Sequence, residues 1–211
     1  MLHRELGARV TIGIDSSRAM LGTTSGHELE GLRFELADID EWTPAEPLDV
    51  VFSNAALHWL PDHRRLFTRL TTMLAPGGEL AVQMPANFDH PSHTVAAEVA
   101  REAPFAEALD GYVRECPVLS PEAYAVLLDE LGFDEQHVRL QVYGHTLESS
   151  ESVIEWVRGT LLTDYEARMS EARFSEFLER YRARLLTALG DARPYFYPFK
   201  RVLLWGLRRR R

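Results

Sequence analysis

Cysteine is almost absent from this sequence, since Cys116 is the one example in 211 residues. A single thiol excludes an internal disulfide and a zinc site built on cysteines, and it is typical of a reducing compartment. Cys116 precedes Pro117 in a loop-like stretch without the pattern of a nucleophile, so we expect it to be structural. Hydrophobic runs long enough to span a bilayer are also missing, and the N-terminus has no signal-peptide core. We therefore expect a cytoplasmic protein with no membrane partner.

Basic residues are outnumbered, because 23 lysines and arginines stand against 32 aspartates and glutamates, for a net charge of −9. This balance argues against a nucleic-acid-binding surface. It also means that an acidic small molecule would be held by a local basic cluster and not by the overall field. A hydrophobic content of 45% predicts one globular domain with room for a subdomain. The composition predicts no oligomeric state.

One stretch, residues 48–62, combines a strand pattern with unusual polar residues. Its first part, LDVVF, is a short apolar run rich in β-branched side chains, which predicts a strand buried on both faces. The run stops at Ser53 and Asn54, and Pro61 then stands at the expected first position of a helix that reaches Leu74. Ligands of open α/β sheets lie just outside the carboxyl ends of the strands, so Asn54 is well placed to bind one. Alternatively, these are the turn residues that any strand exit needs.

Two earlier strands also end in carboxylates. Residues 10–14 read as a buried strand that ends at Asp15, where an acid can accept hydrogen bonds from both hydroxyls of a ribose. The alternative role for Asp15 is to cap the helix that follows. Residues 32–36 alternate as a strand, and Asp38 and Ile39 come directly after it. They could bind the edge and the face of a nucleotide base, or form a solvated turn.

The rest of the chain alternates strands and helices. Gly77 and Gly78 read as a turn, and strands are expected at 79–85, 138–147 and 195–206. Strands separated by helices imply right-handed crossovers, so we predict an α/β fold with a mostly parallel sheet flanked by helices.

Helical signals dominate after residue 85. Ser120 and Gly132 bound one expected helix, while Ser170 and Gly190 bound a long amphipathic one. Two histidines, His90 and His93, have the spacing of a metal pair, but no third ligand is evident. We read them as loop histidines and expect no metal site.

This order of elements resembles the class I S-adenosylmethionine-dependent methyltransferases. In that class the first acidic residue binds the ribose, the second binds the adenine, and the third strand ends beside the methyl donor. The resemblance thus implies a Rossmann-like methyltransferase fold with S-adenosyl-L-methionine as cofactor. It implies a cofactor-binding half over 1–85, and a helical cap with the substrate region and the C-terminal strands of the same sheet over 86–211. The implied cofactor residues are Asp15, Ser16, Asp38, Ile39, Asn54 and Ala55.

Four stretches are more specific: GIDSSRAM at 13–20, SNAALHWLPDH at 53–63, LAPGGELAVQMPANF at 74–88 and FYPFKRVLLWG at 196–206. They resemble the members of that class that methylate trans-aconitate to a monomethyl ester. A carboxylate is already ionised at neutral pH, so no general base is required, and we assign no catalytic residue. Candidates for holding the carboxylates of this small-molecule substrate, each of which could instead be structural, are His58, Trp59, Arg158, Tyr195, Tyr197 and Arg201.

The sequence departs from that class at its start. The class begins with a strand and a glycine-rich loop that cradles the methionine half of the cofactor, and neither pattern is found here. Residues 1–9 read as the end of the next helix. By the resemblance, the absent strand would lie between those ending at Asp15 and Asn54. We therefore expect an N-terminally incomplete chain of low stability and weak cofactor affinity, because unpaired strand edges are costly.

Two other functions stay open at this point. One is methyl transfer to another small molecule. The other is a non-catalytic or degenerate methyltransferase-like domain, which the missing glycine-rich loop would favour.

Overall fold

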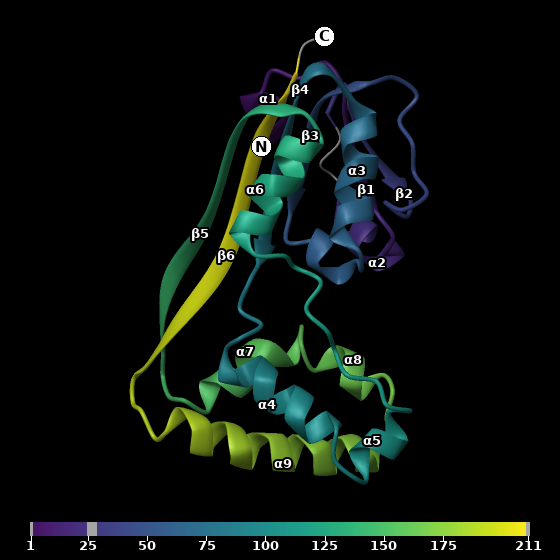
Figure 1. Ribbon diagram of the computed structural model, residues 1–211. Coiled ribbons are helices and arrows are strands. Elements are labelled where there is room, and N and C mark those ends of the chain that lie inside the picture. Colours follow the sequence, from purple (N-terminus) through teal and green to yellow (C-terminus); the bar gives the residue numbers. More distant parts are fainter. Residues whose placement is uncertain (1, 25–28, 210–211) are drawn as a thin grey trace. The chain divides into compact units, whose positions relative to one another are not determined.

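The computed structural model describes residues 2–24 and 29–209 (Figure 1). Met1, the first residue of the expected N-terminal helix, lies outside this part of the chain. The chain divides into two compact units, Met1–Leu48 and Asp49–Arg211. Each unit has its own sheet, and each is described by itself.

The first unit is a small βαβ arrangement. Its elements are α1 (Leu2–Glu5), β1 (Thr11–Asp15), α2 (Arg18–Gly22) and β2 (Leu32–Leu36). The two strands pair in parallel, with Asp15 opposite Leu36. Both predicted strands are confirmed, and their carboxyl ends lie at one edge of this sheet.

Burial in the first unit differs from the prediction. We expected residues 10–14 to be buried, but every residue of β1 is half-buried, and the Val10 before it is exposed. Phe34 of β2 lies across Gly13, where its ring would come within 2.7 Å of an added Cβ, yet it remains 41% exposed. Among the described residues, β1 has one hydrogen-bonded neighbour, β2, so apolar content alone did not predict burial.

The second unit contains a four-stranded sheet of β3 (Leu48–Asn54), β4 (Leu74–Pro85), β5 (Phe133–Leu147) and β6 (Tyr195–Arg208). The strand order is β3-β4-β6-β5, and β6 runs antiparallel to both β4 and β5. The strands expected at 79–85, 138–147 and 195–206 are confirmed and extended. With the parallel β1–β2 pair, the protein has a mixed set of pairings and not only parallel ones.

Three local predictions around β3 and β4 were wrong. The strand β3 is not buried on both faces, because Phe52 is 53% exposed and β3 lies at the sheet edge. Pro61 does not begin the next helix: a 3-10 turn, η1 (Leu57–Trp59), comes first. The helix α3 (His63–Met73) is then capped by Asp62, whose carboxylate accepts a hydrogen bond from a backbone N–H inside the helix. No separate turn at Gly77 and Gly78 precedes β4, which begins directly after α3.

Two helices cover one face of the four-stranded sheet. These are α3 and α6 (Pro121–Glu130), joined by a 5.2 Å ring contact between Phe67 and Tyr124. On β4, Leu80, Val82 and Met84 are buried and alternate with half-buried residues of the other face. Ser120 caps α6 and Gly132 follows its end with a positive φ of 83°, as predicted.

Five further helices form a cap at one end of the long strands β5 and β6 (Figure 1). They are α4 (Pro91–Ala100), α5 (Phe105–Ala108), α7 (Ser152–Arg158), α8 (Thr163–Glu166) and α9 (Glu171–Leu189). The long helix α9 begins at its Ser170 cap and ends at Gly190, as predicted. Its apolar stripe is the centre of a cluster of fully buried rings: Phe105, Tyr165, Phe177 and Tyr181. In the described part of the chain, no helix is both long and apolar enough to cross a bilayer.

Candidate active site

The first unit brings two of the predicted cofactor residues to one sheet edge. Asp15 is the last residue of β1, and Asp38 follows the end of β2. The backbone N–H of Ala37 donates to the backbone carbonyl of Asp15 at 3.1 Å, which ties the two strand ends together. Ser16 and Ile39 are the next residues along the chain from these two acids.

Both carboxylates at this edge are held by local backbone hydrogen bonds. Oδ1 of Asp15 accepts from the N–H of Ser17 at 2.7 Å, and Oδ1 of Asp38 accepts from the N–H of Asp40 at 2.9 Å. Ser17, and not Asp15, is the N-cap of α2. Within the described residues, Oδ2 of each carboxylate has no protein hydrogen bond, so both remain available to the hydroxyl or amine groups of a nucleoside.

The remaining predicted cofactor residues lie in the second unit, at the end of β3. Asn54 is the last residue of that strand, and Ala55 follows with a positive φ of 53°. The backbone N–H of Ala55 donates to the backbone carbonyl of Gln83 at 2.8 Å. This bond fixes the exit of β3 against the far end of β4.

His58 and Trp59 come directly after that exit, on η1. His58 is only 8% exposed, and among the described residues its Nδ1 atom is buried without a hydrogen-bond partner. Burial lowers the pKa of His58 to about 4, and the positive charges of Arg114 and Arg201 lower it further. The imidazole is therefore neutral at pH 7. Trp59 is 47% exposed, and its ring centroid lies 4.2 Å from the guanidinium carbon of Arg114.

Arg201 on β6 meets a polar side chain of the neighbouring strand. Its guanidinium donates to Oε1 of Gln83, and its guanidinium carbon lies 5.1 Å from the Phe199 ring centroid. No carboxylate of the described residues pairs with Arg201. The amide nitrogen Nε2 of Gln83 is buried and, in the same part of the chain, has no hydrogen-bond partner. A buried donor without a partner is unusual in a folded protein.

Arg114 approaches His58 from the loop between α5 and α6. Its Nη1 donates to the Asp164 carboxylate at 2.8 Å, and its backbone N–H donates to the hydroxyl of Tyr165 at 3.2 Å. We did not predict Arg114 or Gln83 as site residues. Gln83 had a visible signal, as the only polar side chain of the LAVQM run. Arg114 had none, because its position depends on contacts with α8.

Tyr195 and Tyr197 connect β6 to the start of α4. The buried hydroxyl of Tyr197 accepts from Nδ2 of Asn87 at 3.0 Å, and the Tyr195 hydroxyl lies 3.1 Å from Nε2 of His90. His90 is the N-cap of α4, where its Nδ1 accepts from the N–H of Ser92 at 3.1 Å. The described residues hold no group of three His, Cys, Asp or Glu side chains that could share a metal ion.

Arg158 is the predicted substrate residue that the structure does not bring to this group. It lies at the end of α7, and its guanidinium is 3.7 Å from the carboxylate of Glu155 on the same helix. Both side chains are exposed, so this ion pair contributes little. No contact between Arg158 and the other candidates is found among the described residues.

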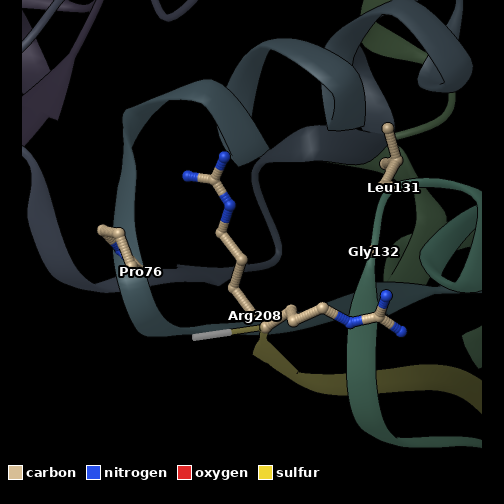
Figure 2. A pocket seen from close by; sticks show the side chains of 5 residues that line it. Pro76, Leu131, Gly132 and Arg208 are labelled. Atoms are coloured by element: carbon tan, nitrogen blue, oxygen red, sulfur yellow. The ribbon is translucent and has the colours of Figure 1, made fainter. Parts of the chain in front are cut away.

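Two open pockets lie in the second unit. One, of about 360 Å³, lies in the cap and includes Phe88, His93 and Arg114 in its lining. The other, of about 250 Å³, lies at the start of β4, with Arg208 between Pro76 and Leu131 (Figure 2). There Arg208 donates to a backbone carbonyl and Arg209 pairs with an aspartate at 2.6 Å, so both cations are already satisfied. The first pocket shares Arg114 with the candidate site, and the second is remote from Gln83 along β4.

Comparison with known proteins defines the class. A family model described as a methyltransferase domain matches residues 1–138, and the chain belongs to this family. Trans-aconitate 2-methyltransferase from Deinococcus radiodurans is 44% identical to it over 203 residues, which cover 93% of this chain and 77% of that protein.

Solved structures agree on the fold. The YcgJ protein from Bacillus subtilis superposes with a TM-score of 0.56 at 14% identity, over 95% of this chain and 83% of the other. Phosphoethanolamine N-methyltransferase 2 from Haemonchus contortus, in complex with phosphomonomethylethanolamine and S-adenosylhomocysteine, gives a TM-score of 0.51 at 18% identity. That match covers 98% of this chain and 45% of the other. The predicted Rossmann-like methyltransferase fold is confirmed.

Proposed function

We propose that this protein transfers a methyl group from S-adenosylmethionine to one carboxylate of trans-aconitate, giving a monomethyl ester. The observation that carries the proposal is the 44% identity to a protein of that activity over most of both chains. The site chemistry agrees with it. In a protein of net charge −9, two guanidinium groups act on the buried neutral His58 of η1: Arg114, which is paired with Asp164, and Arg201, which has no acidic partner among the described residues. Such a cluster suits a small polyanion.

The cofactor residues of this proposal are those that the family resemblance implies. Asp15 would accept from the ribose hydroxyls and Asp38 from the adenine amine, with Ser16 and Ile39 beside them. The free Oδ2 atoms at the edge of β1 and β2 fit those roles. When bound, S-adenosylmethionine supplies the methyl group. Asn54 and Ala55 are proposed to line the methyl donor from the end of β3.

The residues on the substrate side hold and orient the substrate and shield it from water. His58, Trp59 and Arg201 lie on the segments that follow β3 and enter β6, and Tyr195 and Tyr197 anchor the cap to that strand. Because the nucleophile is an ionised carboxylate, the protein needs no base, and alignment with exclusion of water can supply the rate. Arg158 stays a candidate with weaker structural support.

Incubation with S-adenosylmethionine and trans-aconitate tests the reaction directly. We expect S-adenosylhomocysteine and one methyl ester of the tricarboxylate, identified by mass spectrometry. A panel of other small carboxylic acids and amines serves as the control. Turnover of a different acceptor, with none of trans-aconitate, would replace the substrate and keep the class. Cofactor binding without turnover of any acceptor would indicate a degenerate domain.

Asp15→Ala tests the ribose assignment. Loss of hydrogen bonds to a charged group costs about 1.5–3 kcal/mol, so S-adenosylhomocysteine should bind about 10- to 100-fold more weakly in titration calorimetry. Glu41→Ala, an exposed acid of the same unit, is the matched control and should leave affinity unchanged. Unchanged affinity in Asp15→Ala would leave its carboxylate with only a local role at the start of α2.

A further inference from the structure

We infer that Gln83 and Arg201 together form a clamp for one of the substrate carboxylates that is not methylated, so that Gln83 determines specificity for polycarboxylates. This inference rests on the proposed function. Gln83 was not among the residues that the sequence or the family resemblance indicated, and its role comes from the cross-strand geometry of β4 and β6.

The two side chains lie on the same face of the sheet. Pro85 is opposite Arg201 and Gln83 is opposite Leu203, which makes Gln83 and Arg201 diagonal neighbours across the antiparallel pair. That face is not the one covered by α3 and α6, because the buried Val82 and Met84 point there instead. Gln83 and Arg201 therefore lie on the side of the sheet away from those helices.

The hydrogen bonds of Gln83 determine which of its atoms remains available. A guanidinium can only donate, so the atom that contacts Arg201 must be the amide oxygen Oε1. The other atom is then Nε2, which carries two N–H donors and is the buried atom without a partner. Burying an amide donor without a partner is unfavourable, and a ligand oxygen that accepts from it would remove this cost.

The surroundings select a carboxylate for this donor. Arg201 has no acidic partner among the described residues, and the aromatic faces of Phe199 and Tyr143 lie 5.1 and 5.6 Å from its guanidinium carbon. A planar carboxylate can accept from the guanidinium and from Nε2 at once, with each oxygen taking one donor. A cationic or purely apolar ligand would leave Nε2 unpaired and Arg201 without a counter-ion.

The clamp also lies beside the strand end where the methyl donor is proposed to be. The backbone carbonyl of Gln83 accepts from the N–H of Ala55, and the charge of Arg201 acts on His58. A substrate held at Gln83 by one carboxylate would thus present a second one near the end of β3. Three carboxylates on a short chain fit this arrangement, whereas a monocarboxylate could not engage both places.

Gln83→Leu and Gln83→Glu separate recognition from a merely structural role. Gln83→Leu keeps the shape and removes the donor, so KM for trans-aconitate should rise about 10- to 100-fold with little change in kcat. Gln83→Glu should raise KM further, because a carboxylate would replace the N–H₂ and repel the substrate. If Gln83 only positions Arg201, the Glu variant would hold that arginine more strongly and KM would not rise, which would overturn the inference.

Gln136→Leu is the matched control. Gln136 is also a half-buried strand glutamine with one unpaired amide atom, and its Nε2 donates to the backbone carbonyl of Ala125 at 3.1 Å. Its KM should stay within about twofold of the parent protein. Thermal melting of all variants shows whether each one folds.

Dicarboxylates locate the clamped group. Mesaconate, cis-glutaconate and itaconate each lack a different carboxylate of trans-aconitate. Gln83→Leu should weaken the binding of two of them and leave the third, which lacks the clamped carboxylate, unaffected. Equal sensitivity of all three, or of none, would contradict a clamp at Gln83.

Calorimetry with trans-aconitate in the presence of S-adenosylhomocysteine separates the two proposals. If the protein binds the tricarboxylate and Gln83→Leu weakens that binding, the clamp stands even when no methyl transfer is found. If methyl transfer occurs but the variant binds and reacts like the parent protein, the clamp fails and the proposed function stands. Absence of any binding by the parent protein overturns the clamp as well.

Discussion

The two units both have polar side chains near strand ends, but the strands that carry them differ in how deeply they are buried. In the first unit, Asp15 ends β1 and Asp38 comes after β2, and no residue of either strand is buried. In the second unit, Gln83 and Arg201 extend from strands whose alternate residues, such as Val82 and Val202, are almost fully buried. All the buried residues of the described chain belong to the second unit, the earliest being Leu57. Strand patterns and acidic strand ends therefore occur without a core beneath them.

This difference has a thermodynamic consequence. Apolar burial is the main favourable contribution to folding, so the second unit should supply nearly all of the free energy of unfolding. The first unit should open at lower cost, as segments with few buried contacts do. Substitutions that remove equivalent features from the two units provide the tests.

The largest expected effect is on the aromatic cluster of the cap. Phe177 is fully buried, with the Tyr165 and Phe105 ring centroids at 5.1 and 5.4 Å. Phe177→Ala should lower the free energy of unfolding by about 3–5 kcal/mol, because the cap cannot refill the cavity. Phe34→Ala, in the first unit, should cost less than about 1 kcal/mol. Urea denaturation measures both, and equal losses would contradict the comparison.

A smaller effect is expected from pH, through a histidine of the second unit. Burial lowers the pKa of His90 to about 4, against an ordinary value of 6.5, so folding favours the neutral ring. The stability it contributes is complete above pH 6.5 and is lost as the pH falls from 6.5 through 4, at most about 3 kcal/mol. His58 and His93 shift in the same direction.

His90→Asn tests this contribution. Asparagine can still cap α4, but it does not titrate. The drop in melting temperature between pH 7 and pH 4.5 should therefore be smaller in the variant than in the parent protein. An identical drop would mean that the pKa of His90 is the same in the folded and the unfolded protein, which would contradict the effect of burial.

The smallest effect compares two serine caps. The Ser170 hydroxyl accepts from the N–H of Arg173 at the start of α9, and Ser17 accepts from Met20 at the start of α2. Ser170→Ala should lower the free energy of unfolding by about 1 kcal/mol, a usual value for a lost cap. Ser17→Ala should change it by no more than a few tenths of that, because α2 contributes little to the cooperative core. A greater loss in Ser17→Ala would show that the first unit is coupled to the core.

Local sequence patterns predicted the elements of both units well. Capping serines and terminal glycines gave correct limits for α6 and α9, because these residues satisfy backbone groups within one turn. The strands before Asp15 and Asn54 were found from short apolar runs. The start of α3 was missed, since Asp62 competes with Pro61 as a helix start and the 3-10 turn before it has no strong signature.

By itself, the sequence determined the order of strands and helices, the acidic residues at two strand ends and the family to which the chain belongs. The helices, strands and their ends depend on backbone hydrogen bonding over a few residues, which local side chains control, and the family follows from similarity along the sequence. Only the tertiary structure decided that β3 is exposed, that Arg158 lies apart, and that Gln83 and Arg114 join the candidate site. Gln83 and Arg201 are far apart in the chain and meet because of the antiparallel register of β4 and β6. That register depends on packing summed over many residues, and no short motif carries it.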